Sequence, residues 1–181
     1  MDIPRRTLFG SGFKAGTGGV LCALWGRLAK ANSAQTKSQK ASFLLHPVGR
    51  VHRHDEAVHL QIFDPYRAAL LGLDGYSHIF VLYWFDRNDT PGKRRILRVH
   101  PRGNQANPLT GVFACRSPAR PNLIGLTLCR ILSVADGIVQ VDQIDALDNT
   151  PIVDIKPYIP ATDNATEDIR IPAWLTERKP V

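Results

Sequence analysis

Hydrophobic residues in this chain fall into short runs of strand length, separated by turns rich in glycine, proline and charge. Residues 58–62 alternate apolar and polar positions, which is typical of a half-buried strand. The run 79–85 is continuously β-branched and aromatic, which predicts a buried strand. One helical turn is expected at 66–73, and Asp136-Gly137 is the dipeptide of a tight hairpin. Further short strands are expected at 43–51, 96–99, 111–115, 126–134, 138–144 and 152–155.

Many short strands with one short helix predict an all-β fold, a single-domain β-barrel or sandwich. A dinucleotide-binding sheet is not expected, because no G-x-G-x-x-G follows a strand and no βαβ alternation occurs. The expected domain is a barrel over residues 43–162. An irregular tail, 163–181, follows, and its Trp174 could pack on the body or on a partner.

The first 34 residues have the order of a secretory signal: paired arginines, Arg5 and Arg6, a weakly hydrophobic run, then small residues. This order indicates the twin-arginine export route, and residues 35–42 would be a linker. The alternative is an amphipathic N-terminal helix. The protein is expected to be periplasmic if the signal is used and cytoplasmic otherwise, and no later run is long enough for a membrane span.

The net charge of +7 is unevenly distributed. Residues 1–34 carry five basic residues and one acidic residue, a net charge of +4, so residues 35–181 carry +3. That excess does not predict strong salt-driven binding to nucleic acid. Residues 35–181 contain one basic cluster, formed by Lys93, Arg94, Arg95, Arg98 and Arg102. This cluster could be a local RNA-contacting patch, or alternatively a solvated loop beside an edge strand.

Cysteine and histidine spacing gives no metal-binding pattern, and no metal is expected. Cys115 and Cys129 could form a disulfide in an oxidising compartment. Alternatively they are reduced, because both lie in apolar, strand-like runs.

Two polar strings carry the candidate chemistry. In GVFACRSPARPNLIGLT, Arg116 and Arg120 follow a strand and could hold a carboxylate or phosphate, or pair with Asp136 or Asp142. In DALDNTPIVDIKPYIP, proline stiffens a bend that is rich in aspartate. These aspartates could bind ribose hydroxyls, a positive charge or a divalent ion, or simply form turns. Lys156 is expected to pair with one of them.

With YSHIFVLYWF, these strings resemble the TsaA-like (TrmO) family over residues 47–158. The resemblance implies a homodimeric β-barrel that binds S-adenosylmethionine. It also implies methylation of N6 of threonylcarbamoyladenosine in tRNA. With an export signal, the alternatives are a small-molecule acceptor or a binding protein for a nucleoside-like or anionic ligand.

Matching positions in the family strings imply a set of site residues. Arg116 and Arg120 would hold the cofactor carboxylate, and Asp145 or Asp148 would face the ribose or sulfonium. Asp86 stands where relatives commonly have His, and Asn149 replaces the usual Gly of the D-G-T-P turn, which Asn tolerates at positive φ. The candidate catalytic residues are Asp86, His78 and Tyr158. The implied cofactor-binding residues are Phe85, Asp86, Phe113, Arg116, Arg120, Leu126, Gln143, Ile144, Asp145, Asp148 and Thr150.

Overall fold

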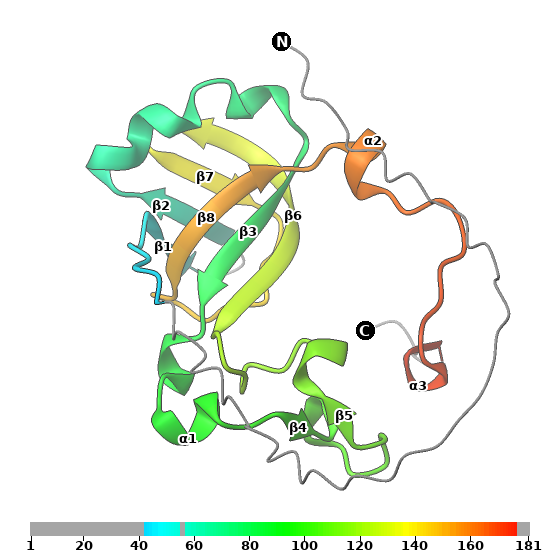
Figure 1. Ribbon diagram of the computed structural model, residues 1–181. Coiled ribbons are helices and arrows are strands. Elements are labelled where there is room, and N and C mark those ends of the chain that lie inside the picture. The colour runs from blue at the N-terminus through cyan, green and yellow to red at the C-terminus, as the bar shows by residue number, and fades with distance from the viewer. Residues whose placement is uncertain (1–41, 55–56, 177–181) are drawn as a thin grey trace, which may run out of the picture. The chain divides into compact units, whose positions relative to one another are not determined.

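Six of the apolar runs close into a β-barrel with the strand order β1-β2-β7-β6-β3-β8. The computed structural model describes residues 42–54 and 57–176 of the chain (Figure 1). Each neighbouring pair of strands is antiparallel, which confirms the predicted all-β class and favours the barrel over the sandwich. The strands are β1 (Gly49–His54), β2 (Ala57–Ile62), β3 (His78–Trp84), β6 (Ile124–Ala135), β7 (Ile138–Val141) and β8 (Pro151–Pro157).

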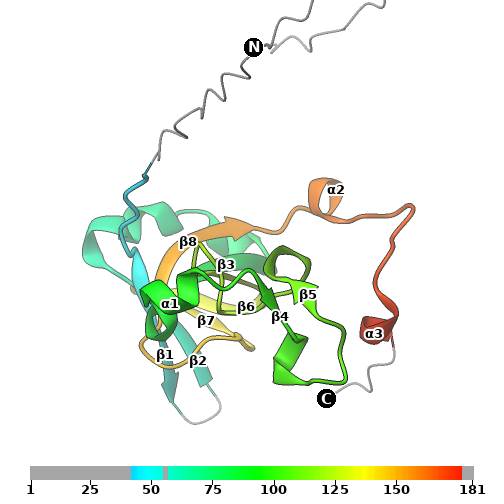
Figure 2. The same cartoon turned by 60° about the horizontal axis from the view of Figure 1, so that its bottom comes forward.

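Short elements between β3 and β6 gather near the end of the barrel where β3 finishes (Figures 1 and 2). They include a two-stranded sheet of β4 (Arg98–Val99) and β5 (Thr110–Gly111). The α-helices are α1 (Pro91–Arg94), α2 (Pro160–Asp163) and α3 (Ala173–Thr176). The 3-10 helices are η1 (Asp64–Leu70), η2 (Leu73–Gly75), η3 (Asp86–Asn88), η4 (Pro101–Gly103) and η5 (Val112–Ala114).

The barrel interior is filled by alternate residues of each strand. In β3, Ile79, Val81 and Tyr83 are buried, whereas the residues between them are only half-buried. The buried strand predicted at 79–85 is β3, but only one of its faces is buried, because a barrel has a single interior. The core comprises Val51, Val58, Leu60, Ile62, Ile79, Val81, Tyr83, Cys129, Val139, Val141, Ile144, Ala146 and Ile152.

Turn chemistry was predicted better than the ends of some strands. Asp136 and Gly137 have φ values of 52° and 79°, which confirms the tight turn between β6 and β7. Residues 43–48 are not a strand, and most of that segment is exposed. The strand expected at 111–115 is also wrong, because β5 ends at Gly111 and the 3-10 helix η5 follows. The helical turn expected at 66–73 is a pair of 3-10 helices.

Cys115 and Cys129 are both free thiols, so the reduced alternative holds. Burial raises the pKa of Cys129 to about 12. Within the described ranges, no helix is long and apolar enough to cross a bilayer. The predicted signal, residues 1–34, lies outside the described residues, as do linker residues 35–41.

Candidate functional site

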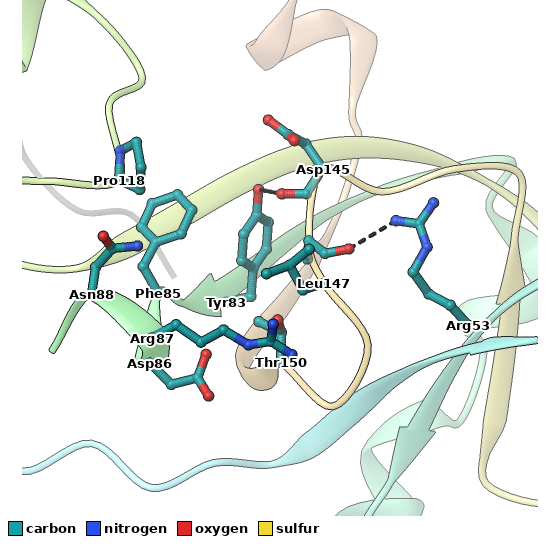
Figure 3. A pocket seen from close by; sticks show the side chains of 11 residues that line it. Arg53, Tyr83, Phe85, Asp86, Arg87, Asn88, Pro118, Asp145, Leu147 and Thr150 are labelled. Carbon is teal, nitrogen blue, oxygen red and sulfur yellow. Dashed lines mark hydrogen bonds between the residues drawn. The ribbon is translucent and has the colours of Figure 1, made fainter. Parts of the chain in front are cut away.

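A cavity of about 280 Å³ lies where β3 ends, and residues far apart in the sequence line it (Figure 3). Tyr83 and Phe85 come from the end of β3, and Asp145 and Thr150 come from the bend between β7 and β8. A β-bulge shifts the pairing of β3 with β8 at Leu82/Tyr83, and such bulges often re-aim side chains beside functional sites. The remaining lining residues are Arg53, Asp86, Arg87, Asn88, Pro118, Ala146 and Leu147.

Tyr83 connects the barrel core to the bend. Its side chain is 1% exposed, and its hydroxyl donates to the Asp145 carbonyl at 2.6 Å and lies 3.2 Å from Thr127 Oγ1. Burial raises the Tyr83 pKa, which keeps the phenol protonated as a donor. The Phe85 ring packs edge-on against Tyr83 with ring centroids 5.5 Å apart. At Gly125 a Cβ atom would collide with the Tyr83 ring, so only glycine fits there without displacement.

Strand β1 holds the same bend from its other side. The Arg53 guanidinium donates to the carbonyls of Ile144 at 3.0 Å and Ala146 at 2.8 Å. The Arg53 backbone N–H donates to Asp148 Oδ1 at 2.9 Å, and this bond is the main cause of the lowered pKa of Asp148. Asn149 has φ of 65°, as expected for an Asn that replaces Gly in this turn. The bend is therefore held in one conformation by contacts with β1 and β3.

A second cavity, of about 500 Å³, shares Tyr83, Phe85 and Asp145 with the first. The string after β5 contributes Phe113, Arg116 and Arg120 to this cavity, and β6 contributes Leu126. The two charged strings therefore meet at one site, as predicted. Asp145 and Arg116 both act on Tyr83 electrostatically, the first raising its pKa and the second lowering it.

The two arginines of the first string differ in availability. Arg120 donates to the Val112 carbonyl at 3.2 Å and so braces its own loop. Arg116 is exposed and, in the described part of the chain, forms no ion pair. The alternative pairing with Asp142 is not found, because Asp142 lies 3.9 Å from Arg130 instead. Arg116 is thus the guanidinium available for a ligand.

Several candidates from the sequence lie elsewhere. Ile144 is a core residue, and neither Gln143 nor Asp148 lines either cavity. His78 and Tyr158 also lie outside the cavities, at the opposite end of β3, where their rings pack edge-on with centroids 6.3 Å apart.

The remaining aspartate of the second string, Asp154, forms an ion pair with Lys156 at 3.1 Å, as expected for that lysine. Among residues 42–54 and 57–176, no group of three His, Cys, Asp or Glu side chains could hold a metal. The divalent-ion alternative for these aspartates therefore has no support within that part of the chain.

Sequence reasoning missed Arg53 and Tyr83. Tyr83 carries the one polar group among the inward-facing residues of β3. A hydroxyl group on an otherwise apolar, buried face could have indicated that Tyr83 forms a specific hydrogen bond. Arg53 offered no local signal, because its carbonyl partners lie 91 and 93 residues away.

The cavities combine apolar walls with a few charged side chains. Phe85 and Leu126 offer apolar walls, Arg116 offers a cation for a carboxylate, and Asp145 offers acceptors for hydroxyls. Ligand sites of about 300–1,000 Å³ with a few convergent polar groups are usual for small molecules.

Comparison with known proteins identifies the family of the chain. Residues 44–164 match the family model of the tRNA-methyltransferase O N-terminal domain. A probable S-adenosyl-L-methionine-binding protein of Methanocaldococcus jannaschii is 46% identical over 116 residues, which are 64% of this chain and 92% of that protein. The tRNA (adenine(37)-N6)-methyltransferase of Mus musculus is 42% identical over 103 residues, which are 57% of this chain and 23% of that enzyme.

A crystal structure of TrmO from Pseudomonas aeruginosa shares the fold, with a TM-score of 0.58 and 27% sequence identity. The match covers 76% of this chain and 64% of the TrmO chain, so this protein spans less than two thirds of that structure. Because the family model covers more than half of the chain, the protein belongs to the TrmO family.

Proposed function

We propose that this protein is an S-adenosylmethionine-dependent methyltransferase that methylates N6 of threonylcarbamoyladenosine in tRNA. The observation that carries the proposal is the convergence of Arg116 and Asp145 on cavities walled by Phe85 and Leu126. The family match supports the reaction class, and the name of the mouse relative supports an adenine of tRNA as acceptor. The assignment of threonylcarbamoyladenosine as the acceptor rests on the resemblance of the sequence strings to the TrmO family.

Three groups of the cofactor have a proposed partner among the lining residues. The Arg116 guanidinium would bind the methionyl carboxylate, and the Asp145 carboxylate would accept hydrogen bonds from the ribose hydroxyls. Phe85 and Leu126 would flank the adenine. When bound, S-adenosylmethionine supplies a methyl group activated by its sulfonium charge.

Catalysis by the protein is mainly a matter of positioning. Holding the reacting atoms in line can contribute about 7–11 kcal/mol at best. The contacts of Tyr83 and Arg53 fix the bend that carries Asp145, so this geometry exists before a ligand arrives. Asp86 lines the first cavity and is the proposed acceptor of the proton from the acceptor amine. His78 and Tyr158 take no part in this assignment.

We also propose a homodimer formed through the outer face of β3 and β6. Leu126 and Leu128, which pair with Leu82 and Phe80, are each 41% exposed, and Leu132 is 47% exposed. This face adjoins the second cavity through Leu126. A second copy would cover exposed apolar surface and close that side of the site.

The twin-arginine sequence favours a second candidate function, in an exported form of the protein. In the periplasm the same cavities would hold a nucleoside-like or anionic ligand, or methylate a small molecule. Cell fractionation with N-terminal sequencing separates the candidates. Recovery of the protein only in the periplasm, with residues before Asn32 or Gln35 removed, would contradict action on tRNA.

The test of the proposed reaction uses tRNA carrying threonylcarbamoyladenosine, with S-adenosylmethionine, followed by mass spectrometry of the nucleosides. We expect a mass gain of one methyl group on that nucleoside and none in tRNA that lacks the threonylcarbamoyl group. Asp86→Asn should lower the rate, by about 10²-fold if the carboxylate is the proton acceptor. Methylation of neither tRNA would contradict the proposal.

A further inference from the structure

A larger groove, of about 1,370 Å³, opens beside the two cavities. It shares Arg116 and Asp145 with the second cavity, and Pro118 and Asp145 with the first. The proposed cofactor site and this groove are therefore continuous. Its walls come from the segments around β4, η4 and η5 and from α3. Figure 1 shows β4 and β5 beyond the end of β3.

The groove is positively charged. Lys93, Arg102 and Arg116 line it, whereas Asp145 is the only carboxylate among its described lining residues. No described partner neutralises these three cations in an ion pair. Unneutralised cations along a groove are the usual electrostatic footprint of a site for a polyanion.

Arg94 belongs to the same basic cluster but, unlike the three cations of the groove, is paired with a carboxylate. Its guanidinium donates to both oxygens of Asp89, at 2.7 and 3.0 Å, and lies 5.3 Å from the centroid of the Trp84 ring. These hydrogen bonds lower the pKa of Asp89 and raise that of Arg94. Arg94 therefore has a structural partner, whereas the side chains of Lys93 and Arg102 have no ion-pair partner among residues 42–54 and 57–176.

The loop that carries Arg102 is braced from within. His100 Nδ1 lies 2.8 Å from the Asn107 carbonyl, and Asn107 Nδ2 donates to the Pro101 carbonyl at 2.9 Å. Arg102 has φ of 62°, a conformation that a residue other than glycine adopts rarely and at a cost. Strained backbone that is held by its surroundings clusters at ligand sites, and the backbone at Arg102 is held in this way.

An exposed aromatic ring stands where the groove meets the second cavity. Phe113 lines both and is 82% exposed, although its neighbour Val112 is buried. Unpaired bases of RNA loops stack on exposed aromatic side chains and are held by cations along the backbone.

We propose that this groove binds the single-stranded RNA loop that presents the acceptor base. Lys93 and Arg102 contact phosphates on the loop, and Phe113 stacks on a base beside the one that enters the cofactor site. This inference rests on the proposed function, because it assigns that site's RNA partner to named residues.

The test measures binding of an RNA stem–loop that carries threonylcarbamoyladenosine in its loop, by fluorescence anisotropy over a range of salt concentrations. The double variant Lys93→Gln, Arg102→Gln should weaken binding at least 10-fold and reduce the salt slope by about 1.4, since each phosphate contact on a single strand contributes about 0.7. Phe113→Leu should weaken binding about 5-fold or more with an unchanged salt slope, because stacking involves no counterion. The matched control combines Arg67→Gln with Arg130→Gln, which also removes two positive charges, from arginines that pair with Asp64 and Asp142 outside the groove.

The inference is overturned if the double variant and the control bind equally well, or if the double variant leaves the salt slope unchanged. Failure of the proposed function is a different result. Lys93 and Arg102 line neither of the two smaller cavities, so the double variant should bind S-adenosylhomocysteine as the wild type does. If RNA binding depends on Lys93 and Arg102 but tRNA is not methylated, the groove is an RNA-binding site and the proposed methylation reaction is wrong.

Discussion

Replacing Tyr83 by Phe removes one buried oxygen and tests how the bend that carries Asp145 is held. The ring is 1% exposed, and its hydroxyl donates to the Asp145 carbonyl at 2.6 Å. Phe fills the same volume, so the loss is one of hydrogen bonding and not of packing. A lost hydrogen bond, with the carbonyl left without this donor, should lower the free energy of unfolding by about 1–3 kcal/mol.

Thermal and denaturant unfolding measure this change. For a chain of this size the loss corresponds to a fall in Tm of roughly 2–12 °C. The control is Tyr76→Phe, because Tyr76 is 42% exposed and its hydroxyl makes no side-chain hydrogen bond in the described part of the protein. Affinity for S-adenosylhomocysteine should also fall in the Tyr83 variant alone, because Asp145 loses its anchor.

The same residue predicts a dependence on alkaline pH. Burial raises the Tyr83 pKa in the folded state above its ordinary value of 10.0. Its contribution to stability is therefore complete below pH 10 and is lost as pH rises through the folded-state pKa. Tyr83→Phe should flatten this alkaline loss. If Tyr83→Phe and Tyr76→Phe are equal in stability, affinity and alkaline behaviour, the anchoring argument is refuted.

Three further substitutions or modifications test single features. At about pH 8.5 iodoacetamide should alkylate Cys115 in the native protein and spare Cys129, whose pKa burial raises to about 12; equal labelling by peptide mass spectrometry would contradict this. Gly125→Ala should cost about 1–3 kcal/mol in denaturant unfolding, because its Cβ meets the buried tyrosine ring, whereas Gly75→Ala, with open space around it, should not. Asp148→Asn should weaken the dependence of stability on acid pH. The pKa of Asp148 is lowered in the folded state, so its carboxylate stabilises the fold above pH 3.8, and this stabilisation is lost as pH falls through the folded-state pKa. An unchanged dependence of Tm on acid pH would count against this.

The fold class was predictable because strand and turn signals are local. Alternation at 58–62, the Asp136-Gly137 turn and an Asn at positive φ each depend on neighbouring residues. The strand expected at 111–115 failed because a short apolar run fits a strand and a 3-10 turn equally well. There, Val112 is buried and Phe113 is exposed in a 3-10 helix.

The two strings that form the candidate site were predictable from the sequence, whereas the residues that hold them in place were not. The two charged strings converge because each leads into a strand that neighbours β3 in the closed sheet, the first into β6 and the second into β8. The sequence motifs marked both strings. Arg53 and Tyr83 hold the bend through contacts with residues 62 or more positions away, and no local pattern encodes such a contact. Long-range partners of this kind appear only once the barrel is closed.

Calorimetric titration with S-adenosylhomocysteine tests the central claim, that Arg116 and Asp145 together form the ligand site. We expect the wild type to bind and Arg116→Ala to lose about 1.5–3 kcal/mol of binding free energy, a weakening of more than 10-fold. Arg130→Ala, whose guanidinium lies outside the cavities and 3.9 Å from Asp142, should bind as the wild type does. Absence of heat from the wild type, or equal affinity in Arg116→Ala and Arg130→Ala, would contradict the account.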